Sequence, residues 1–173
     1  MQERTVEKLT RRALAAALAL GLLCGPARAG GDITGIWMTE DQDGAVLIEP
    51  CADALCGRIV WLKSPLDEEG RPVRDENNSD SSLRARSLCG IAVLGGARPS
   101  GEGWEGGWIY DPNSGTKYAL SIRQGENDTL AVTGFIGVKA MGQTLEWHRA
   151  PAALKRCDGA ATPSGKPAAG SRS

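Results

Sequence analysis

Short runs of apolar and β-branched residues alternate with clusters of turn residues after residue 30, and no run repeats with a helical period. This pattern predicts a β-meander. The expected strands span residues 33–39, 45–49, 56–62, 91–94, 106–110, 116–123, 129–136 and 143–149. Because eight antiparallel strands can close on themselves and leave no exposed edge, the predicted fold is an all-β, eight-stranded antiparallel up-and-down barrel.

One connection in this pattern is unusually long. Residues 63–87, between the third and fourth expected strands, lack apolar periodicity, whereas most connections in compact domains have about four to six residues. The loop carries Asp75, Asn77, Asn78, Asp80, Arg84 and Arg86. These side chains could bind a ligand, with the arginines contacting a carboxylate or phosphate. In the alternative interpretation they cap turns and pair with acidic neighbours, which would make the loop structural.

The N-terminal segment has the pattern of a secretory signal peptide. Lys8, Arg11 and Arg12 precede an apolar run over residues 13–25, and Ala27-Arg28-Ala29 forms a small-x-small cleavage site. The run has 13 residues, too few to span a membrane, which takes about 20. We therefore expect residues 1–29 to be removed on export to the periplasm, by either the general secretory or the twin-arginine route.

The rest of the chain divides into one domain and a tail. Residues 30–150 are the predicted barrel, and residues 151–173, rich in Ala, Gly, Pro and Ser, are a C-terminal extension expected to be mostly disordered. With 24% charged residues and a formal net charge of −1, the chain is neither disordered throughout nor basic enough to bind nucleic acid. We expect a monomer without a cofactor.

Four cysteines remain after cleavage: Cys51, Cys56, Cys89 and Cys157. An even number in an exported chain indicates two disulfides, with three connectivities open. The short and long spacings favour Cys51–Cys56 and Cys89–Cys157. A metal site is not expected, because Cys51-x4-Cys56 is wider than a two-residue zinc knuckle and the only histidine, His148, has no other ligand type nearby at zinc spacing.

The sequence contains little that resembles a known catalytic motif. A Ser-His-Asp triad would have to use His148, and the sequence contains no Gly-x-Ser-x-Gly elbow. Paired carboxylates of the kind used in glycoside hydrolysis stay open, because the sequence does not give distances between acidic residues. We therefore expect a protein that is not an enzyme.

Several segments together resemble a known bacterial family. They are Ile33–Trp37, Ile48–Cys51, Leu55–Leu62, Asp75–Asn78, Leu83–Arg86, Gly107–Pro112 and Trp147–Arg149. In this order they resemble the exported family catalogued as domain of unknown function twenty-one forty-seven, over about residues 31–150. The resemblance implies a lipocalin-type β-barrel. It implies no particular activity, so the function has to be argued from the site.

Gly35-x-Trp37 also resembles the first strand of lipocalins. In that family the tryptophan closes one end of the barrel beneath a basic residue from the last strand, and Arg149 is the matching candidate here. A guanidinium over an indole contributes about 0.5 to 2 kcal/mol, depending on desolvation. The resemblance thus implies that Gly35, Trp37 and Arg149 seal the barrel base and do not form a binding site.

The aromatic residues suggest where a ligand would bind. Trp104, Trp108 and Tyr110 share parity, so in one regular strand they face the same side of the sheet, where they either fill the barrel or line a cavity. Our functional hypothesis is a small, partly apolar and anionic ligand. Trp108 and Tyr110 would pack against its body, and Arg84 or Arg86 would meet its charge. The alternative is a non-enzymatic envelope protein that contacts a protein or cell-wall material without enclosing a ligand.

Overall fold

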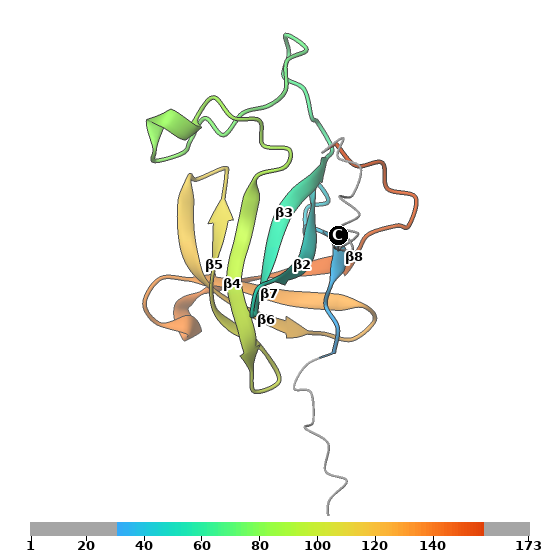
Figure 1. The fold of residues 1–173 in the computed structure, drawn as a ribbon, viewed down its shortest axis with the longest axis vertical. Helices are drawn as coiled ribbons and strands as arrows, with labels where there is room; N and C mark the ends of the chain where they lie inside the picture. Colours follow the sequence, from blue (N-terminus) through green and yellow to red (C-terminus); the bar gives the residue numbers. More distant parts are fainter. Residues whose placement is uncertain (1–30, 158–173) are drawn as a thin grey trace, which may run out of the picture.

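The computed structural model describes residues 31–157, so the predicted signal peptide and the end of the predicted tail lie outside the described residues. Eight strands form a closed antiparallel barrel (Figure 1). They are β1 Gly35–Met38, β2 Gly44–Cys51, β3 Ala54–Leu62, β4 Ala92–Ser100, β5 Gly103–Asp111, β6 Thr116–Gln124, β7 Thr129–Phe135 and β8 Gln143–Arg149. The predicted fold is confirmed.

Each strand pairs with its neighbour in sequence, and β1 closes the barrel against β8 through the pairs Trp37–Arg149 and Met38–His148. β4 and β5 extend well beyond their predicted spans, 91–94 and 106–110. Both contain a glycine with positive φ, Gly96 at 72° and Gly106 at 75°. Such glycines let a strand continue through a bulge, whereas in a sequence they look like turns.

The predicted long loop connects β3 to β4 and lies at the top of Figure 1. It contains the 3-10 helix η1 Ser81–Leu83 and two isolated bridges, Leu66–Pro72 and Arg74–Ser87. A second 3-10 helix, η2 Lys139–Met141, lies between β7 and β8. The long loop is therefore ordered by its own short-range structure and by the contacts described below.

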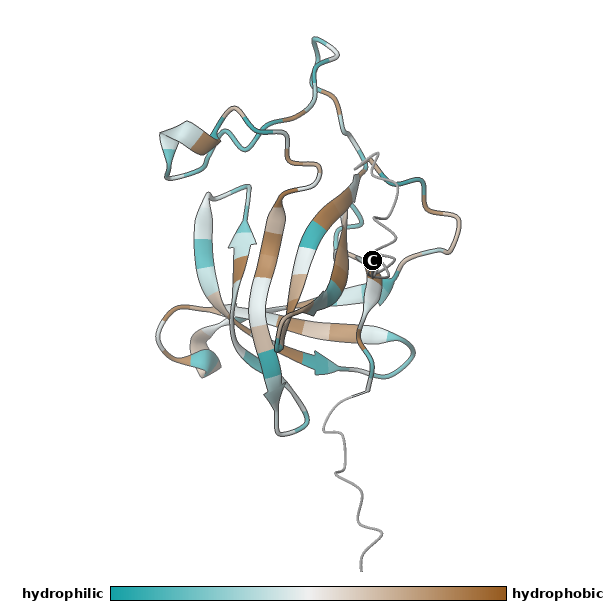
Figure 2. Ribbon diagram, viewed as in Figure 1, coloured by the Kyte–Doolittle hydropathy of each residue, from teal (hydrophilic) through white to brown (hydrophobic). Residues whose placement is uncertain are grey.

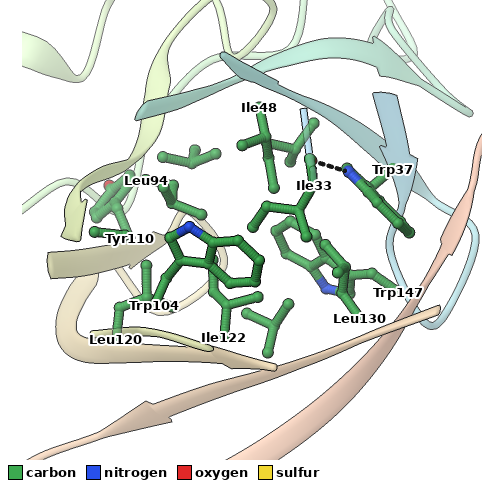
Figure 3. Packing of buried hydrophobic residues seen from close by; sticks show 14 of the residues in the cluster. Ile33, Trp37, Ile48, Leu94, Trp104, Tyr110, Leu120, Ile122, Leu130 and Trp147 are labelled. Carbon is green, nitrogen blue, oxygen red and sulfur yellow. Dashed lines mark hydrogen bonds between the residues drawn. The ribbon is translucent and has the colours of Figure 1, made fainter. Parts of the chain in front are cut away.

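The packed core lies in the barrel interior and includes residues from all eight strands. Trp37, Ile48, Trp104, Ile122 and Leu130 are buried and converge in the interior (Figure 3). Trp104 and Leu130 follow the β4–β5 and β6–β7 turns, so the core is densest at the end where these turns lie, here called the barrel base. Figure 2 shows hydrophobic residues along β3 and β4, hydrophilic residues at the β6–β7 turn and hydrophobic residues in the β7–β8 connection.

Both predicted disulfides are present. Cys51 and Cys56 join β2 to β3 with a Cα–Cα distance of 5.7 Å, and Cys89 joins Cys157 with a Cα–Cα distance of 6.1 Å. The Cys157 N–H also donates to the carbonyl of Val60 at 2.7 Å. The segment after β8 is therefore held against β3 and the end of the long loop.

Because the two disulfides close loops of very different length, we expect their removal to have unequal effects. Cys89→Ser with Cys157→Ser should lower the free energy of unfolding by about 4 kcal/mol, and Cys51→Ser with Cys56→Ser by about 2 kcal/mol. Urea titration measures both values. Free thiols at Cys89 and Cys157 in a non-reducing peptide map of the purified protein would contradict the second bridge.

Among residues 31–157, no helix is long and apolar enough to cross a membrane.

Candidate ligand-binding site

The barrel base is sealed by the predicted pair of Trp37 and Arg149. Trp37 is 0% exposed, and its Nε1–H donates to the carbonyl of Ile33 at 2.8 Å. The Arg149 guanidinium carbon lies 3.7 Å from the centroid of the Trp37 ring, and its Nη1 donates to the carbonyl of Thr34 at 2.8 Å. The base-sealing role that the lipocalin resemblance implied therefore agrees with the structure.

Gly35 makes this closure geometrically feasible. Its φ is 117°, a region that side chains rarely occupy, and a Cβ at this position would lie 2.7 Å from Nη1 of Arg149. Any larger residue would displace the guanidinium from the indole. The three residues assigned to the barrel base thus act as one unit.

A cavity of about 590 Å³ opens at the opposite end of the barrel. Its wall includes Val46, Ile59, Val93, Ile109, Leu145 and Trp147, which are apolar or aromatic. Its rim is formed by the β1–β2, β5–β6 and β7–β8 hairpins and by Leu62 and Leu88, which flank the long loop. The barrel is thus packed at its base and hollow toward the other end, here called the open end.

The rim of the cavity is acidic. Glu40, Asp41, Asp43 and Asp111 line it, and no lysine, arginine or histidine does. Asp43 accepts a hydrogen bond from the Thr39 hydroxyl at 2.7 Å, and Asp111 accepts from backbone N–H groups of its own turn. Among the described residues, none of the four carboxylates takes part in an ion pair.

The predicted residues of the long loop converge on one buried carboxylate. Asp75 is 0% exposed; its Oδ1 accepts from the Tyr110 hydroxyl at 2.5 Å. Its Oδ2 accepts from Asn78 at 2.7 Å and from both Nε and Nη2 of Arg86, at 2.9 and 2.7 Å. Asn78 also donates to the Tyr110 hydroxyl at 3.1 Å. These four side chains, here called the loop latch, fasten the loop to β5.

The loop latch shifts the pKa values of its acidic groups. Burial alone raises the pKa of Asp75, but hydrogen bonds from Tyr110, Asn78 and Arg86 outweigh it, so the pKa lies below its ordinary value. Burial and the hydrogen bond to Asp75 raise the pKa of Tyr110 to about 12. At neutral pH the latch therefore contains a carboxylate, a guanidinium and a neutral phenol.

The other three predicted loop residues also make structural contacts. Asp80 accepts from the backbone N–H and the hydroxyl of Ser82 at 2.9 and 2.7 Å. The Asn77 side chain donates to the carbonyl of Asn113 at 2.9 Å, in the β5–β6 turn, and Arg84 Nε donates to the carbonyl of Asn78 at 2.7 Å. Neither Arg84 nor Arg86 lines the barrel cavity, so the structure does not bring the arginines to the open end. The interpretation in which these side chains cap turns and pair with acidic neighbours describes the observed contacts.

The prediction that Trp104 shares a face with Trp108 and Tyr110 is wrong, whereas Trp108 and Tyr110 do face the same side of β5. The β5–β6 register shifts between Glu105 and Gly107, so the bulge at Gly106 reverses the parity of the residues after it. Trp104 is buried in the core, whereas Trp108 pairs with the exposed Ala119 on the outer face.

Five of the predicted site residues line a different hollow. A space of about 440 Å³ between the long loop and the outer face of β5 and β6 is bordered by Asn78, Asp80, Arg86, Trp108 and Tyr110. Lys117 borders it as well, with its Nζ 4.3 Å from the centroid of the Trp108 ring. Of the predicted ligand residues, only Tyr110 also contacts the barrel cavity.

The cavity wall itself was not identified from the sequence. Ile109, Leu145 and Trp147 appear in the sequence as ordinary inward-facing strand residues, and alternation does not distinguish a filled barrel from a hollow one. The positions of Ile109 and Leu145 toward the open end, and of Trp147 beside Leu130 in the core, emerge only from the strand register. Among residues 31–157, no group of three or more His, Cys, Asp or Glu side chains could hold a metal ion.

Comparison with known proteins agrees with this architecture. No curated protein matches the chain. Protein HP1028 from Helicobacter pylori, whose solved structure is described as belonging to the lipocalin family, is 23% identical, with a TM-score of 0.59. The match covers 70% of this chain and 84% of that chain, and it supports the fold alone. The family model described as "Uncharacterized protein conserved in bacteria (DUF2147)" matches residues 35–149, more than half of the chain. The chain therefore belongs to the DUF2147 family, with a lipocalin-like fold.

Proposed function

We propose that this protein binds one small, mainly apolar molecule inside the barrel. The observation that carries the proposal is the cavity of about 590 Å³, which has apolar walls and lies above a sealed base. Ligand pockets typically have volumes of about 300 to 1,000 Å³ and predominantly hydrophobic linings. A molecule that enters would bury its apolar surface away from water, and this burial would favour binding by about 25 cal/mol per Å².

The packed base and the loop latch would prepare the site for binding. The core around Trp37 keeps the lower half of the barrel rigid, and the latch holds the long loop beside β5 through Asp75. When a cavity is already formed, few side chains or loops have to become ordered on binding, so the entropy cost of binding is small. We therefore assign Asp75, Asn78, Arg86 and Tyr110 a positioning role.

We further propose that the protein acts in the periplasm. The N-terminal segment has the charge and hydropathy pattern of a signal peptide, and the described part of the chain contains two disulfides. Disulfides persist mainly in oxidising compartments outside the cytoplasm. Detection of the mature N-terminus near Gly30 in a periplasmic extract would support this location.

Filling the cavity should abolish binding. Leu145→Trp adds bulk to the cavity wall, so we expect it to weaken binding of the neutral fluorophore 1-N-phenylnaphthylamine at least about tenfold, since the added ring occupies ligand volume. Ala119→Trp introduces the same side chain on the exposed outer face and serves as the control. Fluorescence titration measures both. Equal affinity of the two variants, or no enhancement with the wild-type protein, would contradict an enclosed ligand.

One observation favours a second candidate function, contact with another envelope component. Ile136, Val138 and Met141, in the β7–β8 connection, are 73%, 61% and 85% exposed. Exposed apolar residues that cluster in this way often mark interaction sites. The fluorophore titration separates the two candidates, because a protein that only makes surface contacts would not bind the probe in a manner sensitive to Leu145→Trp.

A further inference from the structure

We infer that the ligand of the barrel is an amphiphilic cation, with an apolar body and an ammonium or similar positive head. This inference rests on the proposed function and narrows it to a class of ligand. It is supported by three features of the open end: the apolar cavity wall, the four rim carboxylates and the exposed apolar residues beside them.

The apolar wall determines where the body of the ligand lies. Val46, Val93, Ile109 and Leu145 face the cavity and offer no charge or strong hydrogen-bonding group. A charged head could not enter this region without losing its hydration, which is costly for an unpaired ion. The head must therefore remain at the rim.

The rim determines the sign of the head. Glu40, Asp41, Asp43 and Asp111 border the cavity without a basic residue among its lining, and none of them is in an ion pair within residues 31–157. Carboxylates at the mouth of a low-dielectric cleft focus a negative potential there. This potential attracts a cationic head and repels an anionic one.

The basic residues around the barrel lie outside the cavity lining, including Lys63, whose backbone N–H donates to the carbonyl of Asp43. Lys139 lies in the same connection as the exposed apolar residues, but its Nζ pairs with Glu105 at 2.5 Å. Arg86 pairs with Asp75 in the loop latch, and Arg149 covers Trp37 at the opposite end. None of these residues lines the cavity, so the positive charge that the rim lacks would come from the ligand.

The exposed apolar residues extend the binding surface beyond the barrel. Ile136 and Met141 line the cavity and yet are largely exposed. A chain longer than the cavity could lie along them and cover surface that otherwise faces water. The open end therefore presents apolar and anionic groups together, which matches the two parts of a cationic amphiphile.

The test compares three probes that share one alkyl chain: dodecyltrimethylammonium, dodecyl maltoside and dodecyl sulfate. Each is titrated below its micelle concentration, as a competitor that displaces 1-N-phenylnaphthylamine from the full chain. We expect the ammonium probe to bind most tightly and the sulfate least. At high salt the preference should shrink, because the rim is exposed and its field is screened.

Charge-removing variants assign the preference to the rim. Glu40→Gln with Asp41→Asn should weaken ammonium binding about three- to tenfold at low salt and leave maltoside binding unchanged. Glu68→Gln with Glu76→Gln removes the same charge from exposed positions of the long loop that do not line the cavity, and it should leave both affinities unchanged.

The outcomes separate this inference from the proposed function. If the maltoside binds and the ammonium probe binds no more tightly, or if Glu40→Gln with Asp41→Asn has no larger effect than the control pair, the inference is wrong and the proposed function stands. If none of the three probes displaces the fluorophore and the fluorophore itself does not bind, both are wrong. A preference for the ammonium probe that depends on the rim supports both.

Discussion

Trp37→Ala should lower the free energy of unfolding by about 3 to 5 kcal/mol, the usual cost of removing a large buried aromatic side chain. Trp37 is 0% exposed, so its removal leaves a cavity in the packed base. It also removes the hydrogen bond to the carbonyl of Ile33 and the ring beneath Arg149. Urea-induced unfolding, followed by circular dichroism, measures the change.

A double-mutant cycle tests whether Trp37 and Arg149 act together. Arg149→Ala alone should cost less, because the guanidinium is partly exposed and its stacking contributes about 0.5 to 2 kcal/mol. If the two side chains are coupled, the double variant should be less destabilised than the sum of the single ones. Strict additivity would show that Arg149 does not stabilise the base through the indole.

Asp75→Ala should lower the free energy of unfolding by about 2 to 4 kcal/mol. Removing one partner of a buried ion pair typically costs about 3 to 5 kcal/mol, and the Arg86 side chain is 35% exposed, which allows water to compensate part of the loss. Tyr110 and Asn78 would also lose their shared acceptor. Hydrogen exchange should increase across residues 63–87, since the loop would be released from β5.

Two comparisons make the Asp75 prediction specific. Asp53→Ala breaks an exposed ion pair with Arg98 and should have a much smaller effect on stability.

The difference in the free energy of unfolding between the wild-type protein and Asp75→Ala should also depend on pH. Because the pKa of Asp75 is lowered on folding, its stabilisation is present above about pH 4 and is lost as the pH falls through the folded-state value. If this difference in the free energy of unfolding is the same at pH 2 as at pH 7, the ionised Asp75 does not stabilise the loop latch.

Local patterns were sufficient for the architecture. The alternation of apolar residues predicted eight strands, and the turn clusters between them predicted their antiparallel order. The spacing of four cysteines favoured the observed disulfides, and the resemblance of Gly35-x-Trp37 to lipocalins implied the contact with Arg149. These features could be predicted because strand periodicity, turn chemistry and cysteine spacing are properties of neighbouring residues or of a shared motif.

The site depended on features that neighbouring residues do not encode. One glycine, Gly106, accommodates a bulge that places Trp108 on the outer face, and a one-residue shift of this kind exchanges the two faces of a strand. Asp75 and Arg86 were recognised as chemically notable, but their pairing with each other and with Tyr110 requires the loop to fold back onto β5.

The charge of the open end shows the same division between sequence and tertiary structure. The sequence by itself determined a disulfide-bonded barrel with a sealed base and a long polar loop. Only the tertiary structure decided which half of the barrel is hollow and which charges surround it. The arginines expected at the mouth lie elsewhere, and carboxylates from two separate hairpins line it instead. Distances between residues remote in sequence follow from strand register and side-chain packing, which depend on the whole barrel at once.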